Sequence, residues 1–85
     1  MDEKIIALGV WDILREKFGI TLVSESEVEK LPLAGKSFEF SAVQMYQLLM
    51  CVEEKFNIYF TSEEIVKHGF HNLSEIYKAI QIKLN

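Results

Sequence analysis

Apolar residues recur at three- and four-residue spacing in three segments of the chain, which is typical of amphipathic helices, and a capping box predicts a short helix in a fourth segment. Three of the segments are long and the third in order is short. The predicted helices cover residues 2–18, 41–56, 61–68 and 72–84. The pattern therefore predicts an all-α fold, a four-helix bundle with a long loop between its first and second helices.

The first predicted helix has a cap at each end. Asp2 can accept a backbone N–H at its start, and Gly19 can end it in the left-handed conformation, with Ile20 folding back on the last turn. Its predicted core stripe is Ile6, Val10, Ile13, Leu14 and Phe18, widened by Ile5, Leu8 and Trp11. Asn57 and Ile58 repeat the same ending after the second helix. Asparagine is the residue that, next to glycine, adopts the left-handed conformation most easily.

Capping boxes mark where the second and third helices begin. Ser41 with Gln44, and Thr61 with Glu64, have the spacing at which each side chain can bond the backbone of the other residue. In the second helix we expect Val43, Tyr46, Leu49, Met50 and Phe56 to face the core, with Leu48 and Val52 on the flanks. Gly69 should stop the third helix after His68.

The last helix should begin near Asn72, with Glu75 three positions later, and it carries one apolar face. This face comprises Leu73, Ile76, Ile80 and Leu84. Residues 21–40 form a long connection that contains the acidic cluster 24–27 and allows a local helix near 25–30. A structureless loop of this length is unusual in a compact domain, so we expect it to pack against the helices through Leu31, Leu33, Phe38 and Phe40.

Composition narrows the functional classes. The 85 residues predict a single domain over 1–85, with little room for a deep catalytic cavity. A net charge of −4 argues against binding to nucleic acid, whose phosphates attract clustered Lys and Arg. The single cysteine is typical of a reducing compartment, and no apolar run is long enough to span a membrane. We expect a cytoplasmic protein that is neither membrane-bound nor secreted.

The sequence contains no pattern of a catalytic or metal site. Cys51 lies among apolar residues and is expected to be a small buried hydrophobe. His68 and His71 alone would leave a tetrahedral zinc ion half-coordinated, so no metal is expected. No phosphate-binding loop or Ser-His-Asp spacing is present, and we expect no enzymatic activity. Five aromatic residues can form core or line an acyl pocket, alternatives that the sequence leaves open: Tyr46, Tyr59, Phe60, Phe70 and Tyr77.

The segment 41–60 resembles the recognition helix of acyl carrier proteins. Members of that superfamily commonly read Asp-Ser-Leu, followed by an apolar helix that ends in Glu-Glu-x-Phe-x-Ile. Glu53, Glu54, Phe56 and Ile58 match this ending, and residues 41–43 (Ser-Ala-Val) take the place of Asp-Ser-Leu. Within the superfamily the chain looks most like the acyl-carrier-related proteins of bacterial peptide-maturation systems.

The resemblance implies that Ala42 stands where carriers have the serine that bears 4'-phosphopantetheine, and alanine has no hydroxyl to modify. A vestigial carrier without this cofactor is therefore the leading interpretation. Ser41 is the alternative attachment site, although its hydroxyl suits a helix cap. Ser37, in a segment that loosely resembles Leu-Gly-Ala-Asp-Ser-Leu, is a weaker alternative.

The resemblance further implies a non-catalytic module that binds a protein partner, an enzyme of peptide maturation or a related biosynthetic pathway. Its partner-binding positions would be Gln44, Gln47, Glu53 and Glu54, on the second helix. Glutamine at two positions that are often acidic in carriers indicates that the usual carrier partners do not recognise this surface. The protein is expected to be a monomer.

Overall fold

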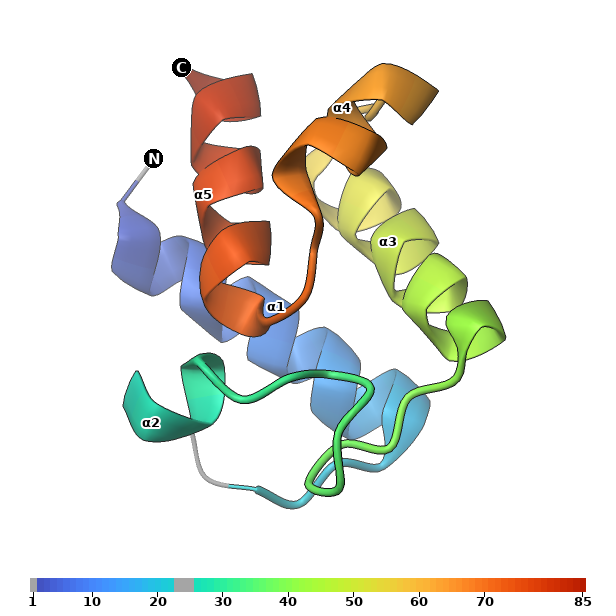
Figure 1. Cartoon of the computed structure of the whole chain (residues 1–85). Coiled ribbons are helices and arrows are strands. Elements are labelled where there is room, and N and C mark those ends of the chain that lie inside the picture. The colour runs from blue at the N-terminus through green and yellow to red at the C-terminus, as the bar shows by residue number, and fades with distance from the viewer. Residues whose placement is uncertain (1, 23–25) are drawn as a thin grey trace.

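The computed structural model describes residues 2–22 and 26–85, and within them all regular structure is helical (Figure 1). The helices are α1 (Glu3–Phe18), α2 (Ser26–Glu29), α3 (Ala42–Phe56), α4 (Ser62–His68) and α5 (Leu73–Leu84). Helix α1 packs against both α3 and α5, and α4 packs against α5. The predicted all-α class is confirmed for the described part of the chain.

The predicted caps define the helix boundaries. At the start of α1, Lys4 N–H donates to Asp2 Oδ1 at 3.1 Å, and at the start of α5 Glu75 N–H donates to Asn72 Oδ1 at 2.9 Å. Helix α1 ends at Gly19, which has a φ of 64°, and Ile20 N–H donates to the carbonyl of Leu14 at 3.1 Å. These local bonds satisfy backbone groups that a helix end leaves without partners.

The core lies where α1 crosses α3 and α5. Its fully buried members include Ile6, Val10 and Leu14 of α1, Leu48 and Val52 of α3, and Leu73, Ile76 and Ile80 of α5. Gly9 lies at the crossing of α1 and α3, where an added Cβ would come within 2.7 Å of the Phe56 ring. The missing side chain lets the two helices approach closely.

The connection between α1 and α3 packs on the helices as predicted. Leu33, Phe38 and Phe40 are buried, and Leu31 is half-buried against the core. Leu33 N–H donates to the carbonyl of His71 at 2.8 Å, and Phe40 N–H donates to the carbonyl of Leu33 at 2.9 Å. The first bond joins the connection to the segment before α5, and the second closes a loop within the connection. The predicted local helix corresponds to α2, while residues 24 and 25 of the acidic cluster lie outside the described residues.

The predicted core face of α3 is wrong at three positions. Val43, Tyr46 and Met50 are 67%, 63% and 53% exposed, whereas Leu48 and its neighbours Leu49 and Val52 are buried. The helix has apolar residues on nearly every side, so their spacing alone does not identify the buried one. Contact with α1 selects the side that contains Leu48 and Val52.

Several smaller expectations are also corrected. Ile5 and Leu8 are exposed rather than part of the α1 stripe, and Cys51 is half-buried rather than buried. Tyr59, three residues after the end of α3, is 71% exposed. Among the predicted core aromatics, Phe60, Phe70 and Tyr77 are buried.

Alanine substitutions on α3 test which side is buried. Leu48→Ala should lower the free energy of unfolding by about 2–5 kcal/mol, because it removes contacts and leaves a cavity. Met50→Ala, two residues away on the exposed side, should change it by less than about 0.5 kcal/mol. Urea unfolding of both variants measures the difference. Equal losses would show that Met50 is buried after all.

An acidic group between α4 and α5 makes stability depend on pH. Glu64 accepts from Lys83 Nζ at 2.8 Å and from Thr61 N–H at 2.9 Å. The Lys83 bond and then the Thr61 backbone bond lower the pKa of Glu64 from 4.5 to about 2. A carboxylate whose pKa is lower in the folded state stabilises the fold above its unfolded pKa, and this contribution disappears as the pH falls.

The free energy of unfolding should therefore decline between pH 4.5 and about 2 in part through Glu64. Lys83→Met should make this decline shallower, because the lysine bond is the largest cause of the lowered pKa. Lys78→Met, at an exposed position of the same helix, is the matched control and should leave the slope unchanged. Thermal unfolding measured across this pH range compares the three proteins. If the stability of all three proteins falls in parallel as the pH decreases, the bond between Lys83 and Glu64 does not cause the pH dependence.

Candidate functional site

The start of α3 is a capped helix end that presents a methyl group. Ser41 Oγ accepts from Gln44 N–H at 3.2 Å, and Gln44 Oε1 accepts from Ser41 N–H at 2.9 Å, so the predicted capping box is confirmed. Ala42 is the first residue of a helix that continues to Phe56, and it is exposed. The position that the resemblance assigns to a modified serine is thus accessible but chemically inert.

The two alternative serines differ in their surroundings. Ser41 is exposed, and its cap uses an oxygen lone pair while the hydroxyl proton stays outside the capping box. Ser37 is exposed in a turn four residues before Ser41 and does not belong to a helix. A phosphopantetheine arm needs an exposed hydroxyl, and the positive end of a helix favours its phosphate. Ala42 cannot bear this group because it has no hydroxyl. Ser41 could bear it, but the modified oxygen is the one that accepts from Gln44 N–H and caps α3.

The side of α3 opposite the core is exposed and carries no charge except at its far end, and we call it the outer face of α3. It comprises Val43, Tyr46, Gln47, Met50 and, at its far end, Glu54. The sequence carries no charged residue from 41 through 52. Neighbouring apolar side chains on a surface mark interaction sites, and interfaces are enriched in tyrosine and methionine and depleted of charge at their centre. This face is not evident from the sequence, because Val43, Tyr46 and Met50 have a spacing that equally suits a buried core stripe.

Two of the four predicted partner-binding residues bond within the chain. Gln44 belongs to the capping box, and Glu53 Oε2 accepts from Phe60 N–H at 2.8 Å, which holds the turn after α3. Gln47 and Glu54 are exposed on the outer face. The structure therefore leaves these latter two for contact with another molecule.

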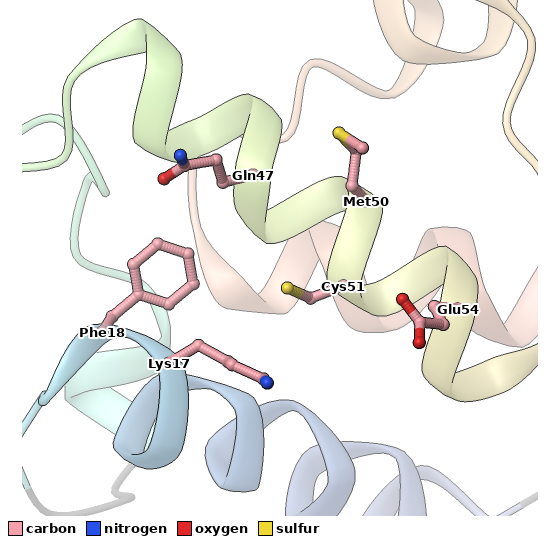
Figure 2. A pocket seen from close by; sticks show the side chains of 6 residues that line it. All are labelled: Lys17, Phe18, Gln47, Met50, Cys51 and Glu54. Carbon is pink, nitrogen blue, oxygen red and sulfur yellow. The ribbon is translucent and has the colours of Figure 1, made fainter.

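A depression of about 390 Å³ separates the end of α1 from α3 (Figure 2). It is lined by Lys17, Phe18, Gln47, Met50, Cys51 and Glu54. In Figure 2 the Phe18 ring and the Lys17 side chain lie across the depression from Gln47 and Glu54. Its apolar floor and charged rim suit a side chain from another molecule, and it continues the outer face of α3 because Met50 belongs to both.

A second depression, of about 340 Å³, lies beside Ala42. It is lined by Ala42, Met45, Tyr46, Leu49, Ile65, Gly69 and Phe70. None of these residues is charged, so the depression suits an apolar group. It borders the outer face on the side opposite Lys17, and it contains two of the aromatic residues for which the sequence left an acyl pocket open, Tyr46 and Phe70.

The remaining candidate groups do not form a reactive cluster in the described residues. His71 Nδ1 lies 3.4 Å from Glu75 Oε1, and His68 packs edge-on against Phe60. In residues 2–22 and 26–85, no three His, Cys, Asp or Glu side chains lie together as metal ligands. None of the helices described has both the length and the apolar character needed to cross a bilayer.

Comparison of the chain with models of protein families, with curated proteins and with solved structures gives no match in any of the three. The functional argument therefore depends on the residues of the outer face and of the α3 start.

Proposed function

We propose that this protein is an acyl-carrier-like interaction module without catalytic activity, which binds a partner protein through α3. The outer face of α3 is the observation that carries the proposal. It combines exposed apolar side chains with an uncharged stretch from 41 through 52, and it is bordered by two depressions. This composition matches the centre of a protein interface rather than an ordinary solvated surface.

The order of the helices supports the carrier-like part of the proposal. A long α1, a long connection, a long α3, a short α4 and a final α5 follow one another in the order that the resemblance implies. Helix α3 is continuous from Ala42 to Phe56. No inserted or missing turn therefore shifts position 42 relative to the Glu-Glu-x-Phe ending. A methyl group at position 42 supports binding without covalent transfer.

The partner class follows from the resemblance to carrier-related proteins of peptide-maturation systems. We infer an enzyme of such a cytoplasmic pathway, which this protein would position or activate. The binding surface is the outer face of α3, with Gln47 and Glu54 as its polar contacts. Glu53 and Gln44 support the shape of the face through bonds within the chain.

A second candidate function is a working carrier with 4'-phosphopantetheine on Ser41. The observation that favours it is the exposed hydroxyl at the start of α3, next to an apolar depression that suits a short acyl chain. Modification of Ser41 would weaken the α3 cap, since the modified oxygen becomes a poorer acceptor for Gln44 N–H. Caps of this kind contribute about 1 kcal/mol to helix stability.

Partner binding can be tested with the products of the genes that flank its own. Met50→Lys should weaken a complex with the cognate enzyme at least tenfold, because it places a charge at the centre of the face. Gln47→Lys should weaken it as well. Ile82→Lys, at an exposed apolar position of α5, is the matched control. Calorimetry measures the affinities. A complex that tolerates both α3 substitutions would refute the proposed surface.

Intact mass distinguishes the two candidates. After coexpression with a broad-specificity phosphopantetheinyl transferase, the native chain should keep its unmodified mass, whereas Ala42→Ser should gain a phosphopantetheinyl group. The variant restores a hydroxyl at the exposed first position of α3. Modification of the native chain that disappears in Ser41→Ala would establish the second candidate. The variant Ser37→Ala controls for the other exposed serine.

A further inference from the structure

We propose that the partner inserts a large apolar side chain into the depression between α1 and α3, with a carboxylate of the partner on one side of it and a cationic group on the other. The carboxylate pairs with Lys17, and the cationic group pairs with Glu54. This inference rests on the proposed function and extends the contact from α3 to the end of α1. It states which side chains the partner must present there.

The depression is the apolar end of a longer groove between α1 and α3. It adjoins a second depression of about 390 Å³. This second depression is lined by Ile13, Glu16, Lys17, Cys51, Glu54 and Lys55. Lys17, Cys51 and Glu54 line both depressions, so the two meet at these residues. A segment of a partner can therefore lie along the groove while one of its side chains enters the end at Phe18 (Figure 2).

The surfaces inside this end are apolar and only partly covered by the chain itself. Phe18 is half-buried, with its ring centroid 5.0 Å from that of Phe40, and Cys51 is half-buried. Met50 is 53% exposed and also belongs to the outer face, so a partner that lies on that face reaches the depression over apolar surface. An apolar side chain that enters removes these surfaces from water, which favours binding.

Two opposite charges border the depression. Lys17 and Glu54 are exposed on opposite sides of it, and they form no ion pair with each other (Figure 2). The ion pairs within residues 2–22 and 26–85 join Lys55 to Asp12, His71 to Glu75 and Lys83 to Glu64. The charges of Lys17 and Glu54 are therefore available to another molecule.

These charges select among the possible occupants. A molecule that covers the depression removes water from both charges, and this costs free energy unless each charge gains a partner. A polyanion such as a nucleic acid pairs with Lys17 but repels Glu54, and a purely apolar ligand leaves both unpaired. A protein segment with an apolar residue between an acidic and a basic one satisfies the floor and both charges, and a segment with the charges reversed is rejected.

Carbodiimide coupling tests the pairing of Lys17 in the complex with the cognate enzyme. The reagent joins an ammonium group to a carboxylate that contacts it. Mass spectrometry should therefore find Lys17 bonded to an aspartate or glutamate that lies beside a large apolar residue of the enzyme. Lys78, exposed on α5, is the control and should not couple. A complex in which Lys17 couples no more than Lys78 would overturn the proposal.

Charge reversal tests both sides of the depression. Lys17→Glu and Glu54→Lys should each weaken the complex about tenfold or more, because each places like charges together. Lys78→Glu and Glu63→Lys make the same changes of net charge at exposed positions of α5 and α4. These controls should bind like the native chain in calorimetry, and circular dichroism confirms that every variant is folded. Equal affinities for all five proteins contradict the pairing.

Alkylation of Cys51 by iodoacetamide separates this inference from the proposed function. Bound enzyme should slow the reaction severalfold, because the inserted side chain covers the half-buried thiol. If a complex forms and Cys51 still reacts as fast as in the free chain, the depression is not occupied, while binding through the outer face stands. If calorimetry finds no complex, the proposed function fails and this inference fails with it.

Discussion

The packing of α1 against both α3 and α5 determines which side of each of these helices is buried. Ile6, Val10 and Leu14 of α1 are fully buried, and Gly9 allows the Phe56 ring of α3 to come close. Because this contact holds Leu48 and Val52 inward, Val43 and Met50 must point outward from the opposite side of the same helix. The exposed apolar face is thus a consequence of how the core is assembled, and it cannot be reburied by a local adjustment.

The structure agrees with the sequence analysis where the determining interactions are local. The capping boxes at Ser41 and Thr61 and the left-handed endings at Gly19 and Asn57 each depend on residues within one helical turn. Such patterns can be recognised from spacing alone. The same holds for the existence of α1, α3 and α5, because apolar residues recur at helical spacing along each of them.

The structure differs from the sequence-based prediction where contacts between distant parts of the chain determine which side chains are buried or bonded. A helix with apolar residues on two sides gives two possible core faces, and only contact with α1 distinguishes them. The hydrogen bond between Leu33 and His71 joins segments far apart in sequence, and no local pattern predicts it. Glu53 matched an exposed position of the carrier motif, yet its carboxylate holds the backbone of Phe60. Two of the four predicted partner-binding residues, Gln44 and Glu53, therefore have a structural role that their positions in the motif do not reveal.

The outer face of α3 alone is too small to hold a partner tightly. Burying an apolar side chain of the size of Val43 or Met50 contributes about 1.5–3 kcal/mol, while association costs at least about 4 kcal/mol in lost freedom of motion. A partner that meets the outer face alone therefore gains little beyond this cost. An enzyme can add the depression at Phe18 and the one beside Ala42, which border the face on either side. A partner that fills both depressions should therefore bind more tightly than one that contacts the outer face alone.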